Sequence, residues 1–230
     1  MHQLTDLEKK INIPFKNKEL LKNAFVHRSY LNENKQFNLP SNEKLEFLGD
    51  SVLSLITSIY LYKNYPELHE GEYTDIKASI VKTESLYEAA KDLQLGKYLY
   101  LSKGEDANKG RSSISILADC FEALIAVIFL DRDFDTAYEF VCGFLFAEKL
   151  PYIITNRLYL SSKNKLQEFI QNKYKKLPIY QVLTQEGPEH NKLYHVGVYF
   201  DNKLIGEGTG KSKKIAEEMA AAQSLQKMKI

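Results

Sequence analysis

The segment from Ser113 to Leu130, SISILADCFEALIAVIFL, limits the possible folds of this chain more than any other. Its only ionisable side chains apart from the thiol of Cys120 are Asp119 and Glu122. A helix that is apolar on all sides must be buried within its own protein, and the two acids interrupt the apolar run too early for a membrane span. The segment therefore predicts a buried helix, against which other elements must pack.

The two acids of this segment need a partner inside the protein. Asp119 and Glu122 are three residues apart and so project from one face of the predicted helix. A buried carboxylate is costly unless a cation, hydrogen bonds or a proton compensates for its charge. A structural salt bridge could do this, but the segment contains no Lys or Arg. The pattern therefore favours a bound metal ion over a purely structural pair.

A second group of acids occurs in the sequence EKLEFLGD, residues 43–50. With about 100° per residue in an α-helix, Glu46 lies at about −60° and Asp50 at about −20° from Glu43. Carboxylates in so narrow an arc raise one another's pKa, and a hard divalent cation would remove the repulsion. A solvated face of a surface helix explains this segment equally well when it is taken alone.

The spacing of apolar residues predicts that the first 150 residues are almost entirely helical. The loop signals at residues 103–110, KGEDANKG, predict a flexible connection. We expect a helical domain over residues 1–158 and a linker over 159–162. The expected helices of this domain are Glu19–Tyr30, Leu45–Tyr62, Tyr73–Asp92, Ile114–Leu130 and Asp135–Leu145.

Residues 163–230 have a different pattern and predict a second, smaller domain. Three segments alternate or are rich in β-branched and aromatic residues, with Asp201 and Asn202 at a tight hairpin turn. A helix is expected on each side of them. The fold class is thus an all-α domain followed by a small α+β domain of order α-β-β-β-α. The expected elements are Lys163–Lys175, Tyr180–Glu186, Tyr194–Phe200, Lys203–Thr209 and Ile215–Met228.

The net charge of +1 hides an asymmetry between these two parts. Residues 1–155 carry a net charge of −5 and residues 156–230 one of +6, which suggests chemistry in the first part and polyanion binding in the second. Lys211, Lys213 and Lys214 lie at the start of the last expected helix, where free backbone N–H groups also attract phosphate. The GxxxxGK[ST] pattern is absent, so no nucleotide cofactor is expected.

Several function classes are disfavoured by the rest of the sequence. No signal peptide or membrane span is expected. Cys120 and Cys142 are predicted to be reduced core thiols of a cytoplasmic protein. No histidine pair has metal-ligand spacing, so oxygen should hold any metal, and His69 and His195 are treated as structural. Residues 131–135, DRDFD, mimic the start of an EF-hand but lack its later glycine and glutamate.

These motifs together resemble a known family. Residues 163–230 resemble a double-stranded-RNA-binding domain through LQE (166–168), GPEH (187–190) and GEGTGKSKKIAE (206–217). Residues 1–158 resemble the catalytic domain of bacterial ribonuclease III, whose signature is NEKLEFLGD (42–50). ILADCFEALI (116–125) matches the second acidic block of that family, and HRS (27–29) and EG (70–71) match weaker motifs.

The resemblance implies a role for each matching acid. Asp50 and Glu122 would be the residues most important for turnover. Glu43 and Glu70 match accessory acidic positions of the family. The implied ligands of a divalent metal, Mg²⁺ with Mn²⁺ as a possible substitute, are Glu46, Asp50, Asp119 and Glu122.

The resemblance also implies the partners of the chain. Phe47, at about +40° on the helix and beside the acids, matches a phenylalanine that packs into the second subunit of a homodimer. We expect two groups of residues in the second domain to contact RNA: one at the hydroxyls of the minor groove, and one at the phosphates between two minor grooves. The first group is Gln167, Glu168 and His190, and the second is Lys211, Lys213 and Lys214.

The sequence therefore predicts a metal-dependent endoribonuclease that cleaves double-stranded RNA. The resemblance implies products with 5′-phosphate and 3′-hydroxyl ends, and processing of precursor ribosomal and other structured RNAs. One alternative is a non-catalytic RNA-binding protein, in which the acids hold a structural metal or the first domain serves as a dimeric scaffold. A second alternative is a metal-dependent phosphohydrolase acting on small molecules. The basic C-terminal part disfavours the second alternative.

Overall fold

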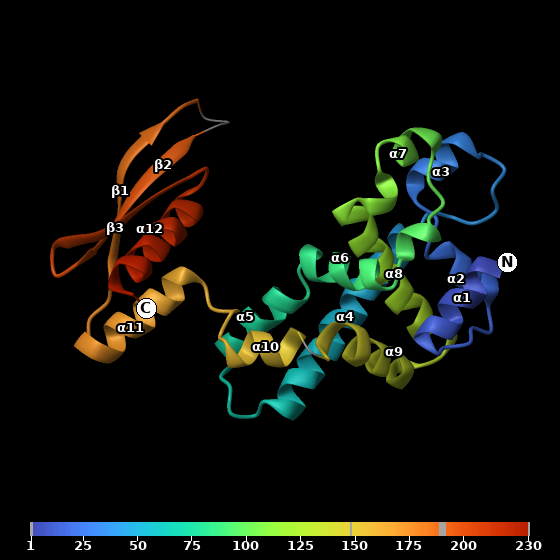
Figure 1. Cartoon of the computed structure of the whole chain (residues 1–230), viewed down its shortest axis with the longest axis horizontal. Coiled ribbons are helices and arrows are strands. Elements are labelled where there is room, and N and C mark those ends of the chain that lie inside the picture. The colour runs from blue at the N-terminus through green and yellow to red at the C-terminus, as the bar shows by residue number, and fades with distance from the viewer. Residues whose placement is uncertain (1, 148, 189–191, 230) are drawn as a thin grey trace. The chain divides into compact units, whose positions relative to one another are not determined.

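The computed structural model describes residues 2–147, 149–188 and 192–229, and divides the chain into two compact units (Figure 1). The first unit extends to Tyr159 and the second begins at Leu160. The first is helical and the second combines helices with one sheet, which confirms the predicted fold class. The expected domain limits at residues 158 and 163 remain predictions.

Helix α8, Ile114–Asp131, forms the core of the first unit. Most of its side chains are buried, as its apolar composition predicts. Helix α4, Glu43–Asn64, packs along it, and helix α6, Thr83–Asp92, also lies against it. The other helices of this unit are α1 His2–Ile11, α2 Lys18–Asn23, α3 Arg28–Glu33, α5 Glu70–Ile80, α7 Lys103–Ala107, α9 Phe134–Val141 and α10 Lys149–Thr155, with single turns at Leu95–Lys97 and Gly110–Ser112 and a π-helical turn at Cys142–Phe146.

Two of the expected long helices are broken in the structure. The predicted helix Glu19–Tyr30 is wrong because α2 ends at Asn23 and α3 begins at Arg28, with Val26 between them paired to Tyr100. The predicted helix Tyr73–Asp92 separates into α5 and α6, because Lys82 is extended. In the first case a contact with a distant segment interrupts the helix, and in the second the extended backbone at Lys82 does so.

Other local predictions were also wrong. The segment expected as a flexible loop forms α7, where the Ser102 hydroxyl accepts a hydrogen bond from the backbone N–H of Glu105 at 3.1 Å. The Arg111 guanidinium then forms a two-oxygen contact with Asp106. The expected helix Asp135–Leu145 ends as an α-helix at Val141. Helices α1 and α10 were missed.

Two segments that the sequence analysis set aside as functional signals contain residues that cap helices. His69 and the Glu72 side chain form a capping box at the start of α5. Asp133, in the EF-hand-like segment, caps α9 by accepting from the backbone N–H of Thr136 at 2.7 Å. Cys120 is buried and Cys142 half-buried, and both are free thiols.

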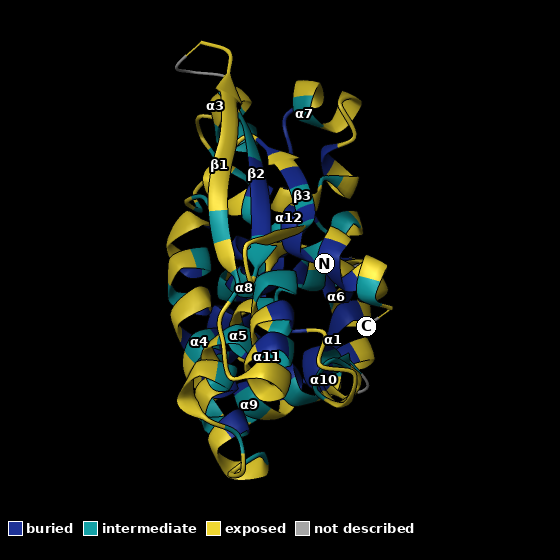
Figure 2. Ribbon diagram, turned by 90° about the vertical axis from the view of Figure 1, so that its left-hand side faces the viewer, coloured by how far each residue is buried: buried dark blue, intermediate teal, exposed yellow. Residues whose placement is uncertain are grey.

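The second unit is a three-stranded antiparallel sheet with two helices on one face (Figure 1). The strands, in their order across the sheet, are β1 Ile179–Glu186, β2 Leu193–Phe200 and β3 Lys203–Gly210. Figure 2 shows that β1 is largely exposed, while the middle of β2 is buried. Leu166, Ile170, Val198 and Leu225 form much of the core between the helices and the sheet. The two helices are α11 Ser162–Tyr174 and α12 Lys213–Met228.

Two details of this unit follow from its sequence. Asp201 and Asn202 have positive φ angles of 48° and 59°, as a two-residue hairpin turn requires. A Cβ at Gly208 would lie 2.2 Å from the backbone nitrogen of Ala220. Only glycine therefore allows β3 to approach α12 so closely.

By length and composition, α4 is the one helix in the described ranges that could cross a membrane. Its first two turns carry Glu43, Glu46 and Asp50, and the helix packs along α8. These features are those of a core helix with a polar end.

Candidate metal centre and RNA-binding surface

The acids of the two motifs meet because α4 and α8 cross at very short range. Gly49 is buried at the crossing, and a Cβ there would lie 1.9 Å from the carbonyl oxygen of Glu122. Because Gly49 has no side chain, the two backbones can touch at this point. The contact brings Glu46 and Asp50 of α4 close to the acids of α8. Two stretches more than 60 residues apart thus form one site.

Three carboxylates form the centre of this site. Glu46, Asp119 and Glu122 each offer an oxygen, and these atoms all lie within 4.8 Å of one another. All three side chains are partly buried. Asp50 is exposed and lies outside this group, although its charge acts on Glu122. The structure thus brings three of the four expected metal ligands together and leaves the fourth beside them.

The charges in this centre are poorly compensated by the protein. Burial, followed by the charges of Asp50, Asp119 and Glu46, raises the pKa of Glu122 to about 8. Burial and the Asp119 charge also raise the pKa of Glu46. The pKa of Asp119 is raised by burial as well, against an opposing effect from His27 and Arg28.

Such a set of oxygen donors suits a hard divalent cation, which would compensate for the charge that burial makes costly. The donor set of the described residues around this point contains carboxylates and no thiolate. The site therefore fits the metal that the sequence analysis expects.

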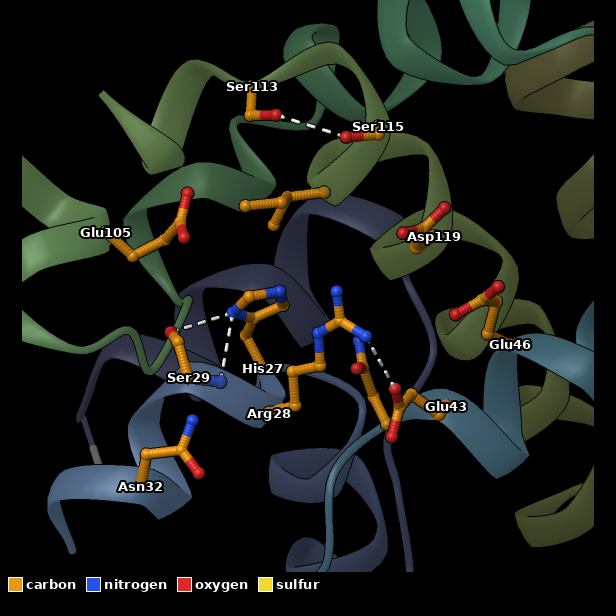
Figure 3. Close-up of a pocket in the computed structure, with 12 residues that line it drawn as sticks. His27, Arg28, Ser29, Asn32, Glu43, Glu46, Glu105, Ser113, Ser115 and Asp119 are labelled. Atoms are coloured by element: carbon orange, nitrogen blue, oxygen red, sulfur yellow. Dashed lines mark hydrogen bonds and ion pairs between the residues drawn. The ribbon is translucent and has the colours of Figure 1, made fainter. Parts of the chain in front are cut away.

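A pocket of about 560 Å³ opens beside Glu46 and Asp119 (Figure 3). Figure 3 shows Arg28 extending from α3 toward the middle of the pocket, between His27 and Glu43. The guanidinium of Arg28 lies 3.6 Å from a carboxylate oxygen of Glu43. Of the three acids of the centre, Glu46 and Asp119 are therefore open to the pocket.

The floor of the pocket is fixed by contacts between distant segments. The backbone N–H of His27 donates to the carbonyl of Tyr100 at 3.2 Å, and the N–H of Tyr100 donates to Phe25 at 2.8 Å. Asn42, which is 4% exposed, donates from its side chain to the carbonyl of Ala24 at 3.0 Å. We call residues 24–29 the strap, because these bonds hold them to the start of α4 and to Tyr100.

The remaining acids and the aromatic residue expected near the centre are placed differently from one another. Glu43 lines the pocket, accepts a hydrogen bond from Ser41 at 2.7 Å and contributes to the raised pKa of Glu46. Glu70 is exposed at the start of α5, where it accepts from Thr74 at 3.2 Å, and lies outside the cluster. Phe47 is 78% exposed on α4, so its ring has little packing within this chain.

The residues expected at RNA lie at the surface of the second unit. Gln167 is exposed and Glu168 half-buried on α11, and the three lysines are exposed at the start of α12. The Ser212 hydroxyl caps α12 by accepting from the backbone N–H of Ile215 at 3.2 Å. His190 lies outside the described residues.

Sequence reasoning missed the residues that support the pocket. Asn42 and Tyr100 hold the strap in place through hydrogen bonds to its backbone. Such bonds leave no periodic pattern in the sequence. Glu105 also lines the pocket, from a segment expected to be a loop. The HRS motif was a usable signal, because the ring of His27 accepts from the N–H of Ser29 and so starts α3.

Comparison with known proteins gives matches to both units. A family model described as Ribonuclease-III-like matches residues 17–149, and one described as a double-stranded RNA binding motif matches residues 162–228. Proteins named Ribonuclease 3 from Dehalococcoides mccartyi and Clostridium acetobutylicum are 42% and 44% identical, over 98% and 96% of this chain. The matches cover 95% of each of those proteins.

Solved structures resemble the first unit. The nuclease domain of ribonuclease III from Campylobacter jejuni is similar with a TM-score of 0.59 and 32% identity, over 65% of this chain and 97% of that one. A second structure of that domain, which describes flexibility in a region involved in dimer formation, has a TM-score of 0.57 and 33% identity, over 62% of this chain and 96% of that one.

Proposed function

Since the chain belongs to the ribonuclease III family, we propose that it is an endoribonuclease that cleaves double-stranded RNA at the carboxylate centre between α4 and α8. The products would carry 5′-phosphate and 3′-hydroxyl ends. The observation that carries the proposal is the convergence of Glu46, Asp119 and Glu122 to within 4.8 Å. The basic unit at the C-terminal end would hold the duplex.

Glu46, Asp119 and Glu122 would hold the metal, with Asp50 beside them. Mg²⁺ is the proposed ion, because it prefers carboxylate and water oxygens, and Mn²⁺ is a possible substitute. When bound, such an ion activates water and stabilises charge on the phosphate and leaving oxygen. The protein residues orient these groups, and Glu122 must give up its proton as the site fills, since its pKa lies near 8.

The second unit would recognise the shape of A-form RNA. A domain of this kind spans about 16 base pairs and contacts two minor grooves and the phosphates between them. The N-terminus of α12 carries free backbone N–H groups, and three exposed lysines lie beside it: Lys211, Lys213 and Lys214. Both features attract phosphate, so this end of the helix suits the phosphates between the grooves. Gln167 and Glu168 would contact the minor groove, and His190 is assigned to the same surface.

The active form would be a homodimer in a cytoplasmic setting. Phe47 is exposed beside the acids and would pack into the second subunit. The Campylobacter structure that describes a dimer-forming region supports this arrangement. Each subunit would cut one strand and leave short 3′ overhangs, in precursor ribosomal and other structured RNAs.

One experiment tests the proposal. The full-length protein is incubated with a long RNA duplex, with and without Mg²⁺, beside Glu122→Gln and Glu139→Gln variants. We expect metal-dependent cleavage by the wild-type protein, none by Glu122→Gln, and equal RNA binding by both. Glu139, on α9 and outside the cluster, is the matched control, and its variant should cleave normally. Binding without cleavage under Mg²⁺ and Mn²⁺ would instead indicate a non-catalytic RNA-binding protein.

A further inference from the structure

The pocket beside the metal centre has a charge that opposes its proposed substrate. Its acidic lining includes Glu43, Glu46, Glu105 and Asp119. A phosphodiester carries negative charge, so it meets repulsion from these groups as it approaches. Among the described residues that line the pocket, Arg28 is the only lysine or arginine.

The backbone of Arg28 is held firmly in place. It is the first residue of α3, directly after His27, whose ring caps that helix. The strap that contains both residues is bonded to Tyr100 and to Asn42 at the start of α4. Because α4 also carries Glu46, the base of the Arg28 side chain and the carboxylates belong to one rigid framework.

The guanidinium of Arg28 is held only weakly by the protein, through one long ion pair with Glu43. The side chain is 73% exposed, and it lies 3.6 Å from Glu43, which is beyond the range of a good hydrogen bond. Arg111 is a useful contrast, because its nitrogens contact Asp106 at 2.9–3.1 Å and also donate to backbone carbonyls. Arg111 is fully engaged by the protein, whereas Arg28 keeps its donors available.

We propose that Arg28 is a phosphate-binding catalytic residue, whose guanidinium contacts the non-bridging oxygens of the scissile phosphodiester in the pocket. A planar guanidinium can bind two phosphate oxygens at once, which a lysine cannot do. Glu43 holds the guanidinium loosely until the phosphate replaces it. The inference rests on the proposed nuclease function and assigns a residue outside the acidic cluster to it.

A merely structural role makes a different prediction. If Arg28 only offsets the charge of the acids, any cation at this position suffices, and its loss changes metal binding. If Arg28 binds the phosphate, the planar two-pronged shape of its guanidinium matters. Loss of Arg28 then slows cleavage, while metal binding is retained.

The test uses Arg28→Gln, Arg28→Lys and, as a charge-matched control, Arg132→Gln. Arg132 is exposed and lies outside the residues that line the pocket. Single-turnover cleavage of a saturating RNA duplex is measured, together with the Mg²⁺ midpoint, the duplex Kd in EDTA and the thermal midpoint of each variant.

We expect Arg28→Gln to cleave about 100-fold more slowly than the wild type, which is the usual effect of removing one donor from a developing charge. Arg28→Lys should recover part of the rate, to about tenfold below the wild type. The Mg²⁺ midpoint and the Kd should stay within about threefold, because the C-terminal unit is proposed to supply most of the phosphate contacts. Arg132→Gln should match the wild type in cleavage rate, Mg²⁺ midpoint and Kd, and only its thermal midpoint should fall slightly, because the bond from Arg132 to the Pro14 carbonyl is lost.

Three outcomes would overturn the inference: an unchanged rate in Arg28→Gln, full recovery by Arg28→Lys, or a shifted Mg²⁺ midpoint that accounts for the slower rate. If Arg28→Gln fails to fold, the rate of Arg28→Lys decides alone. An inactive wild-type protein would refute the proposed nuclease function itself, and this result is separate from the other three.

Discussion

Gly49 on α4 lies directly against the backbone of Glu122 on α8, with space for a hydrogen atom but none for a methyl group. Replacing Gly49 with alanine would place a Cβ 1.9 Å from the Glu122 carbonyl oxygen and force the helices apart. We expect a loss of stability of about 3 kcal/mol or more and a loss of cleavage. Thermal or denaturant unfolding checks the first effect, and a duplex cleavage assay checks the second.

Gly71→Ala is the matched control for this substitution. Gly71 lies in α5, and a Cβ there meets nothing within 4 Å. Alanine is the better helix former by about 0.8–1 kcal/mol, so this variant should be as stable as the wild type or slightly more so. Equal behaviour of the two alanine variants would contradict the close crossing.

The pH dependence of the metal-free protein should reveal the raised pKa of Glu122. Its carboxyl ionises near pH 4.5 in the unfolded chain but near pH 8 in the folded one. Between these values the unfolded state loses the proton first, so the contribution of Glu122 to stability falls as the pH rises and is fully lost above about pH 8. Melting curves in EDTA from pH 5 to 8.5 should show this slope in the wild type and a weaker one in Glu122→Gln.

Mg²⁺ should reverse that trend. At the proposed site the ion would bind the ionised carboxylates, so binding should release protons near neutral pH and its stabilising effect should grow as the pH rises. Calorimetry in two buffers of different ionisation enthalpy measures the released protons. A proton release that is equal in the wild type and in Glu122→Gln would argue against Glu122 as the group that titrates.

The lysines at the start of α12 should control the salt dependence of RNA binding. Replacing Lys211, Lys213 and Lys214 with alanine removes three expected phosphate contacts, and the slope of log K against log salt should become shallower by roughly 2–3. Filter binding or fluorescence anisotropy over a salt series measures it. Lys227→Ala, in the last turn of the same helix, should leave the slope unchanged, and an equal effect there would refute the assigned surface.

Asn42 should be essential for the strap. Asn42→Ala leaves the buried Ala24 carbonyl without its side-chain donor, which costs about 1–3 kcal/mol, and it should slow cleavage by loosening the pocket floor. Asn64→Ala removes a comparable bond, to Tyr60 at 2.8 Å, from an exposed position. That variant should unfold and cleave nearly as the wild type does, so a similar loss in both would show that the strap is not involved.

The sequence predicted which acidic residues form the site better than it predicted the packing that brings them together. Helical geometry alone placed Glu46 beside Asp50 and Asp119 beside Glu122, because 3.6 residues per turn fixes which side chains share a face. The resemblance implied that the two pairs meet. The role of Gly49 in that meeting depends on the backbone of a second helix, which no local pattern encodes.

The broken helices show the same limit. Periodicity continued through Val26 and Val81, but pairing with Tyr100 ends one helix and an extended Lys82 ends the other. Such contacts join residues more than 70 positions apart in the first case. In the second unit the helices, strands and hairpin were predicted to within two residues, since each is fixed by its own local sequence.

The first turns of α4 should tolerate few substitutions, because most sides of the helix have a role. One side of its first turns faces the carboxylate centre, another lies on α8, and Phe47 points outward toward the proposed second subunit. We therefore expect a substitution on any of these sides to alter turnover, folding or assembly. In a library of random variants, we expect tolerated changes in this region to concentrate at Lys44, whose exposed side chain is assigned to none of the three.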